Sequence, residues 1–164
     1  EDFVGQIIHP QEWNSSIDYE NKKVAVIGSG ATAVTLIPEI AKKASHVTMI
    51  QRSPTYIASA PSKYKILHLL NYISPKLGYK IIRFTNILRQ RRIYRRAMRS
   101  PELVKNYLLD LVRDELPGFD IEKHFTPSYN PWEQRLCLAP DSDFFESINQ
   151  KRVSVETETI DSFS

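Results

Sequence analysis

The spacing of apolar residues predicts a strand, a helix and a second strand within the first 54 residues. A short apolar run at Val24–Ile27 ends at a glycine, and its length is typical of a strand buried on both faces of a parallel sheet. Apolar residues then recur at spacings of three and four from Ala33 to Ala44, which predicts one buried stripe on a helix that Pro38 should kink. A second run, His46–Ile50, predicts another strand. Together these elements form a βαβ unit, whose crossover is nearly always right-handed.

A longer stretch, residues 55–124, has helical apolar spacing and predicts an all-helical insertion. Apolar residues gather at 66–73, and a second group at 81–88 follows Ser74-Pro75. A third helix is predicted to begin at Ser100-Pro101, with serine as the N-cap and proline in the first turn. It is predicted to stop at Leu116-Pro117-Gly118, since proline and glycine interrupt helices.

The remaining residues complete an α/β fold class: a Rossmann-like dinucleotide-binding βαβ core with a helical insertion. Residues 125–140 are rich in proline and are interpreted as loop. A short helix is predicted at 143–150 and a strand at 153–157, where apolar and polar residues alternate. The expected organisation is a linker at 1–21, a Rossmann-like domain at 22–54 and 125–164, and the helical insertion at 55–124.

A glycine-rich turn between the first strand and the first helix is the strongest chemical signal. Residues 28–33 match the pattern G-x-G-x-x-G/A, and the strand before and the helix after them make the match informative. Such a turn lets the backbone approach a pyrophosphate, which then sits at the helix N-terminus. The alternative is a tight turn that binds nothing. The expected cofactor-binding residues are Gly28, Ser29, Gly30, Ala31, Thr32 and Ala33.

The end of the second strand indicates which dinucleotide is bound. An acidic residue there accepts a hydrogen bond from the ribose 2′-hydroxyl of NAD, whereas an arginine pairs with the 2′-phosphate of NADP. This chain has Arg52, with Gln51 beside it and no acid nearby. The guanidinium is a permanently charged fork that suits a phosphate, so NADP(H) is favoured over NAD(H). The alternative is that Arg52 is a solvated surface residue.

Composition narrows the class of protein. The 164 residues carry 22 Lys and Arg against 19 Asp and Glu, a net charge of +3, and 41% are hydrophobic. These values exclude a disordered, collagen-like or fibrous chain. No apolar run reaches the roughly 18 residues of a transmembrane helix. The single cysteine, Cys137, excludes an internal disulfide and is consistent with the cytoplasm. Because the chain starts at Glu1 with no methionine, we expect it to be a piece of a longer protein.

The charge is concentrated in one basic segment between Ser62 and Pro101. It contains eleven basic residues and no acidic one: Lys63, Lys65, Lys76, Lys80, Arg83, Arg89, Arg91, Arg92, Arg95, Arg96 and Arg99. The first interpretation is a solvated helical face whose apolar side packs on the core. The second is a basic amphipathic helix that makes peripheral membrane contact through residues 63–99. Nucleic acid is not expected, because the aromatic platform of a single-strand binder is not evident.

The start of the chain resembles a known family. Phe3-x-Gly5-x-x-x-His9-x-x-x-Trp13 is similar to the fingerprint of class B flavoprotein monooxygenases, especially the Baeyer–Villiger type, although Asn14 stands where the family has Pro or Asp. In that family the fingerprint lies just before the NADP-binding turn. Here it precedes Gly28 by 15 residues, which agrees. The resemblance covers essentially the whole chain.

The resemblance implies two cofactors, NADP(H) and FAD, and a reaction with O₂ that inserts one oxygen atom into a ketone to give an ester or lactone. The stretch Tyr129–Arg135 looks like the family segment that brings an essential arginine to the flavin, so it implies a catalytic role for Arg135. Gln134 is expected near the NADP phosphates. Segments that bind FAD are expected before Glu1 and after Ser164, and this piece alone is expected to be inactive. No metal site is expected.

Two other functions remain open at this point. One is a nucleotide-binding module whose basic helix docks on a membrane. The other is a flavin-containing N- or S-oxygenase, which would differ mainly in lacking the helical insertion and Arg135.

Overall fold

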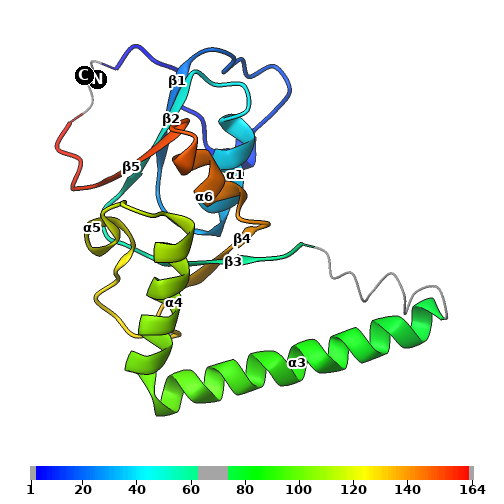
Figure 1. Ribbon diagram of the computed structural model, residues 1–164. Coiled ribbons are helices and arrows are strands. Elements are labelled where there is room, and N and C mark those ends of the chain that lie inside the picture. Colours follow the sequence, from blue (N-terminus) through cyan, green and yellow to red (C-terminus); the bar gives the residue numbers. More distant parts are fainter. Residues whose placement is uncertain (1–2, 63–73, 163–164) are drawn as a thin grey trace.

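A three-stranded parallel sheet carries the predicted βαβ unit. In this computed structural model, which describes residues 3–62 and 74–162, the strand order is β1-β2-β5 (Figure 1). The bounds are β1 Lys23–Ile27, α1 Ala31–Ile40, β2 His46–Gln51 and β5 Val153–Thr157. Val24 pairs with Val47, and Val47 with Val153, so apolar residues align across the sheet. The fold class, the two first strands, the helix between them and the last strand are confirmed.

The sheet is buried on one face only. Val47, Met49, Val153 and Val155 are buried, and α1 and α6 (Asp143–Asn149) pack on this side of the sheet. On β1 every second residue is exposed, including Ile27 at 60%. The expectation that this strand is buried on both faces is therefore wrong. A parallel sheet is buried on both faces only when helices cover both faces. Among the described residues, helices cover one face of this sheet.

A second pair of strands lies beneath the first sheet. β3 (Tyr56–Ala60) and β4 (Leu136–Pro140) pair in parallel, with Ile57 opposite Cys137. The all-helical interpretation of residues 55–124 is wrong at β3, and the loop interpretation of residues 125–140 is wrong at β4. Both strands contain Ala, Ser or Pro, which have low strand propensity, and their pairing joins residues about 80 positions apart, which local patterning does not reveal.

The helices follow their predicted signals more closely. α4 (Pro101–Glu115) has Ser100 at its N-cap and ends just before Leu116-Pro117-Gly118, as predicted. α6 confirms the short helix predicted at 143–150. Pro38 lies inside α1 without ending it. Two short elements, the 3-10 helix η1 (Pro10–Glu12) and α5 (Ile121–Phe125), complete the described structure. The helix expected at 66–73 falls outside the described residues.

The core consists of two apolar clusters. The larger one packs α1, α6 and the three-stranded sheet around an aromatic group, in which Phe125, Phe144 and Phe145 have ring centroids 5.6–6.4 Å apart. The smaller one joins β3, α4 and the end of α3 through Tyr56 and Ala97. The larger cluster includes residues of β2 and β3 and the smaller one includes residues of β3, so the loop between these strands is held at both ends.

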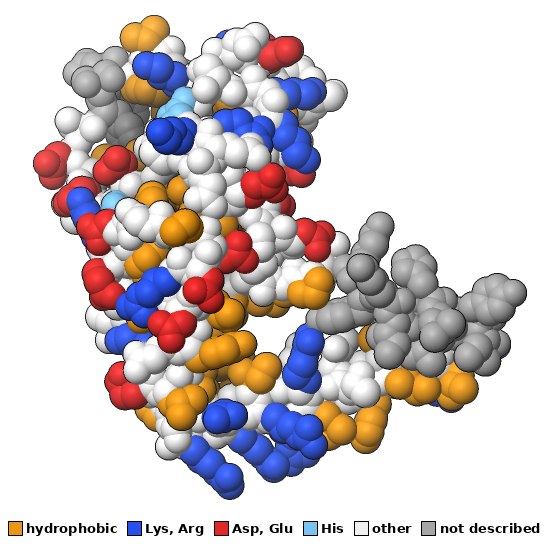
Figure 2. All heavy atoms as spheres, viewed as in Figure 1, with side chains coloured by type: hydrophobic (Ala, Val, Ile, Leu, Met, Phe, Trp, Pro, Cys, Tyr) orange, Lys and Arg blue, Asp and Glu red, His pale blue; other side chains and the backbone are white. Residues whose placement is uncertain are grey.

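Helix α3 (Pro75–Arg99) extends away from this body (Figure 1). Only Gly78 and Ala97 of its 25 residues are buried. Figure 2 shows Asp and Glu side chains over the body, whereas α3 carries basic and apolar ones. Leu77 and Phe84 are 54% and 63% exposed. The interpretation that this segment packs its apolar side on the core is therefore wrong for these residues.

Candidate functional site

The glycine-rich turn lies at the carboxyl ends of the parallel strands. Gly28 has φ +117°, a conformation that L side chains rarely adopt, and its N–H donates to the Ile50 carbonyl at 2.8 Å. Gly30 is the N-cap of α1 and has no side chain to cap the helix. The first N–H groups of a helix have no acceptor within it, so this end suits an anion.

Two hollows meet at this turn. The first, about 460 Å³, is called the Arg52 hollow, and its lining includes Ile27, Ile50, Arg52 and Thr159. The second, about 660 Å³, is called the Arg135 hollow, and its lining includes Gly30, Tyr129, Gln134 and Arg135. Gly28, Ser29 and Thr55 line both hollows. The turn thus separates two spaces that each contain a predicted arginine.

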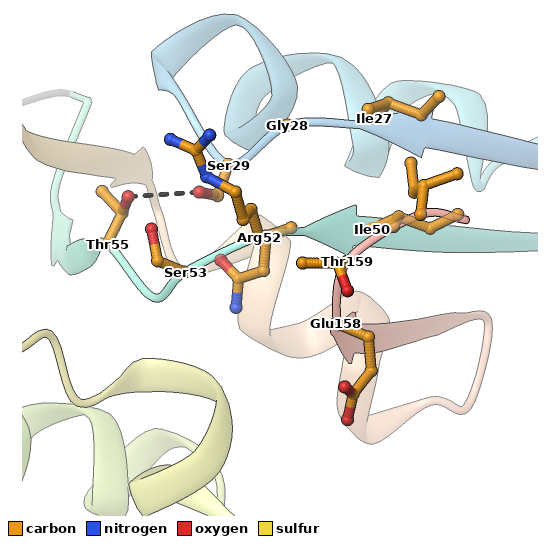
Figure 3. A pocket seen from close by; sticks show the side chains of 11 residues that line it. Ile27, Gly28, Ser29, Ile50, Arg52, Ser53, Thr55, Glu158 and Thr159 are labelled. Carbon is orange, nitrogen blue, oxygen red and sulfur yellow. Dashed lines mark hydrogen bonds between the residues drawn. The ribbon is translucent and has the colours of Figure 1, made fainter. Parts of the chain in front are cut away.

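The Arg52 hollow has an apolar side and a cationic side. In Figure 3 the Arg52 side chain extends from the end of β2 toward the turn at Gly28 and Ser29, and Ile27 and Ile50 lie on the other side. The Glu158 carboxylate points away and forms an ion pair with Lys123 at 3.0 Å, which raises the pKa of that lysine. Within residues 3–62 and 74–162, no carboxylate forms an ion pair with Arg52. The hollow therefore offers an unneutralised positive charge.

Gln51 supports the hollow from below. Its side chain is buried, and its nitrogen donates to the His124 carbonyl at 2.7 Å and to Thr157 Oγ1 at 2.9 Å. Nδ1 of His124 is 2.8 Å from the same hydroxyl, and burial lowers the pKa of this histidine. The predicted cofactor residue Gln51 thus ties the end of β2 to α5 and β5. It fixes the direction of Arg52 rather than presenting a free amide nitrogen to a ligand.

The Arg135 hollow is built on a hydrogen-bonded turn. Asn130 donates from its backbone and its side chain to the Glu133 carboxylate at 2.8 and 2.9 Å, and these bonds lower the pKa of Glu133. Trp132, within this turn, has φ +72°. Glu133 also lines this hollow, but its carboxylate accepts from Asn130, and no carboxylate of the described residues forms an ion pair with Arg135.

Tyr56 on β3 anchors the turn to the core. Its hydroxyl donates to the Tyr129 carbonyl at 2.7 Å, and the two rings meet edge to face at 5.4 Å. Burial raises the pKa of Tyr56 to about 12, so the phenol stays protonated and keeps donating. The Tyr129 hydroxyl in turn donates to the Arg135 carbonyl at 3.3 Å. This chain of bonds fixes the position from which the Arg135 side chain starts.

The arginine then reaches the glycine turn. A Cβ atom added to Gly30 would lie 3.3 Å from Nη1 of Arg135, so the guanidinium lies directly above the bare backbone. Two further contacts hold the turn: Ser29 Oγ is 3.1 Å from Thr55 Oγ1 (Figure 3), and Cys137 Sγ donates to the Ser29 carbonyl at 3.7 Å. Burial raises the pKa of the Cys137 thiol, so it stays protonated for this contact.

The structure brings together most, but not all, of the predicted site residues. Gly28, Ser29, Gly30, Gln51, Arg52, Gln134 and Arg135 line one or both hollows. Ala31, Thr32 and Ala33 form the first turn of α1, where Ala33 is buried against the core. Sequence reasoning missed Thr55 and assigned no role to Tyr56 and Tyr129. Thr55 lies just after Ser53-Pro54, and no motif in the sequence marks it as part of a site.

The fingerprint residues have a packing role, and none of them is among the residues that line the two hollows. The ring of Phe3 lies over Gly5, where a Cβ would come within 2.3 Å of a ring carbon, so a side chain at position 5 would displace this ring. His9 caps η1 by accepting from the Gln11 N–H at 3.4 Å. Trp13 contacts Tyr19, with ring centroids 5.4 Å apart.

Curated relatives match over the whole chain. It is 49% identical over 167 residues to the FAD-containing monooxygenase EthA of Mycobacterium tuberculosis, covering 100% of this chain and 34% of that protein. It is 50% identical over 164 residues to the probable FAD-binding monooxygenase AlmA of Acinetobacter baylyi, covering 99% of this chain and 33% of that protein. The chain thus spans about a third of the length of these relatives.

Solved structures share the fold. A steroid monooxygenase bound to NADP aligns with a TM-score of 0.71 and 16% identity, over 94% of this chain and 36% of that one. Cyclohexanone monooxygenase from Rhodococcus sp. Phi1, bound to NADP⁺, aligns with a TM-score of 0.66 and 18% identity, over the same shares, 94% and 36%. The model of the flavin-binding monooxygenase-like (FMO-like) family matches residues 1–117. The chain therefore belongs to the flavin-binding monooxygenase-like family.

Proposed function

We propose that this chain is the NADP(H)-binding portion of an FAD-dependent monooxygenase of the Baeyer–Villiger type, which inserts one oxygen atom of O₂ into a ketone to give an ester or lactone. FAD would bind to other segments of the natural protein. When bound, NADPH and FAD would supply the redox chemistry. The residues of this chain would bind NADP(H), orient it and hold a fixed charge beside it.

The observation that carries the NADP(H) proposal is the pair of hollows that meet at the glycine turn, each with an arginine that forms no ion pair with a carboxylate of the described residues. A dinucleotide has the same plan, with two halves joined by a pyrophosphate. The pyrophosphate would lie on Gly30, where a side chain is absent. The adenosine 2′-phosphate would pair with Arg52, and the nicotinamide half would extend toward Arg135.

Arg135 has the properties of a group that stabilises developing negative charge. A guanidinium remains protonated at any working pH, and its position is fixed through the hydrogen bonds of Tyr56 and Tyr129. Charge stabilisation is strongest when the cation is already oriented before the reaction begins. The ketone substrate is supported by the fold shared with an enzyme named cyclohexanone monooxygenase.

Calorimetric titration tests the cofactor part. The natural protein that carries this chain, loaded with FAD, is titrated with NADPH and with NADH. We expect tighter binding of NADPH, because Arg52 pairs with the additional phosphate. Equal affinity for both nucleotides would contradict the assignment of Arg52, and the absence of binding to either would contradict the assignment of the glycine turn.

Isotope labelling tests the reaction. The same protein is incubated with NADPH and a cyclic ketone under ¹⁸O₂. The expected product is a lactone that contains one ¹⁸O atom. If an amine or a sulfide is oxygenated instead while the ketone remains unchanged, the protein is an N- or S-oxygenase and the Baeyer–Villiger proposal is wrong.

A further inference from the structure

We propose that helix α3 docks on an anionic membrane surface through the face that points away from the body. Helix geometry defines this face, because successive residues turn by about 100°. Leu77, Ile81, Phe84 and Leu88 form one stripe in the first half of α3, and the same stripe continues in the second half as Arg91, Arg92, Arg95 and Arg99. We call these eight residues the outer face.

The opposite face is the one that contacts the body. Ala97 is fully buried in the cluster with Tyr56 and α4, and the Tyr94 ring meets Trp132 at 6.3 Å. Both contacts lie near the carboxyl end of the helix, and the remainder extends away from the core (Figure 1). The outer face therefore turns its side chains away from the elements that hold α3 in place.

The outer face exposes apolar side chains that the core does not cover. Leu77 is 54% exposed, Ile81 39% and Phe84 63%. All four arginines of the face are exposed as well. Figure 2 shows apolar and basic side chains next to each other along the edge of this arm. Helices that lie in a membrane interface combine apolar side chains that insert with basic side chains that bind headgroups, and the outer face carries both kinds.

Charge complementarity identifies the occupant. The stretch between Ser62 and Pro101 contains no acidic residue, so the helix itself supplies no carboxylate beside the four arginines of the outer face. A lipid surface with anionic headgroups offers acyl chains for the apolar half and phosphates for the arginine half, whose guanidinium groups bind phosphate oxygens in pairs. Nucleic acid fits less well, because Phe84 is the single aromatic residue of the outer face and stacking needs several.

The binding mode would be peripheral. No helix in the part of the chain that the structure describes is long and apolar enough to cross a membrane. The helix would lie along the surface, with Phe84 and its apolar neighbours inserted and the arginines at headgroup depth. The proposal concerns α3 alone and does not depend on the nicotinamide site.

Vesicle sedimentation tests the proposal with the full-length natural protein. Vesicles made of equal parts of phosphatidylglycerol and phosphatidylcholine are compared with vesicles of phosphatidylcholine alone. The test variant replaces Arg91, Arg95 and Arg99 by glutamine. The matched control removes the same charge from the body through Lys23→Gln, Lys43→Gln and Lys151→Gln, which are exposed positions.

We expect the wild-type protein to bind the anionic vesicles and the test variant to lose affinity by about fivefold for each arginine removed, roughly a hundredfold in total. The loss of vesicle affinity in the control variant should be several times smaller than in the test variant. Phe84→Ser should also weaken binding, and salt should reduce it through screening. Replacement of the same three arginines by lysine keeps the charge and should retain most of the binding, which separates loss of charge from loss of folding.

Several outcomes would overturn the proposal. They are the absence of vesicle binding by the wild-type protein, an equal loss in the test and control variants, and wild-type binding to duplex DNA but not to vesicles.

Discussion

The two arginines of the site are held in different ways. Arg52 follows directly on β2, the central strand of its sheet, and Gln51 fastens the end of that strand through two hydrogen bonds. Arg135 comes just before β4 and follows a turn that is fixed by Tyr56, Tyr129 and Glu133. A strand end that one buried side chain fastens therefore positions the first arginine, whereas a turn held by several side chains positions the second. We call the Arg52 hollow with its supports the Arg52 half of the site, and the Arg135 hollow with its supports the Arg135 half. Different substitutions should disrupt the two halves.

The largest effect is expected at Arg135. In the natural protein Arg135→Ala removes the fixed charge beside the glycine turn, and we expect ester formation to fall by roughly 100- to 1,000-fold. NADPH affinity should change far less, because the helix terminus and Arg52 remain. Product analysis and calorimetry measure the two quantities. Near-normal oxygenation in Arg135→Ala would remove this residue from the mechanism. Arg135→Lys keeps the charge, so its rate of ester formation should lie between those of the wild type and Arg135→Ala.

A smaller and more selective effect is expected at Arg52. Arg52→Gln removes the charged partner of the 2′-phosphate, and we expect NADPH to bind roughly 10- to 150-fold more weakly while NADH affinity stays nearly constant. The matched control is Lys43→Gln, which removes one charge near the far end of α1. If both variants weaken NADPH equally, the effect is long-range electrostatics rather than a direct contact.

The different anchoring also explains what the sequence could predict. The βαβ unit around Arg52 is local: an apolar run, a helical stripe and a second run lie within 29 residues, from Lys23 to Gln51, and each announces its own secondary structure. The pairing of β3 with β4 joins Tyr56 to Leu136, which no local pattern indicates. Tertiary packing decides the conformation of such short strands.

The same contrast holds for the site residues. Gly28 and Gly30 lie in the glycine-rich turn and Arg52 lies at the end of the second strand, positions that a Rossmann-like unit uses for its cofactor, so spacing alone predicts them. Arg135 came only from a family resemblance. Its supports could not be derived, because the hydroxyl of Tyr56 and the carbonyl of Tyr129 meet only after β3 has paired with β4. Gln51, a predicted cofactor residue, lines the Arg52 hollow, and no local pattern indicates that its amide nitrogen also bonds to the His124 carbonyl.

Gln51→Ala should loosen the Arg52 half. It leaves the His124 carbonyl and the Thr157 hydroxyl without their donor in a buried place, and we expect the free energy of unfolding to fall by about 2 kcal/mol. Denaturant unfolding measures the change. Asn149→Ala is the control, because its amide donates to the Glu115 carbonyl at an exposed position and should matter less. Similar losses in both variants would mean that the buried hydrogen bonds of Gln51 contribute no more to stability than an exposed one.

Tyr56→Phe should loosen the Arg135 half with a smaller cost. The substitution keeps the ring but removes the donor to the Tyr129 carbonyl, and we expect a loss of about 1 kcal/mol in unfolding free energy. Because the Arg135 turn loses its anchor, ester formation should fall while the preference for NADPH over NADH is kept. The exposed Tyr107→Phe serves as a control for loss of a hydroxyl. A shifted nucleotide preference in Tyr56→Phe would show that the two halves are not independent.

Lowering the pH should destabilise the Arg52 half through His124, by less than either substitution. Burial lowers the pKa of His124 in the folded protein below its ordinary value of 6.5. The unfolded chain therefore takes up a proton first as the pH falls, and stability is lost from about pH 6.5 downward until the folded pKa is reached. His124→Asn removes this titration, so its unfolding free energy should depend less on pH between neutrality and mild acid. The exposed His9→Asn is the control. Parallel pH curves for wild type and His124→Asn would mean that protonation of His124 does not loosen the clamp under Arg52.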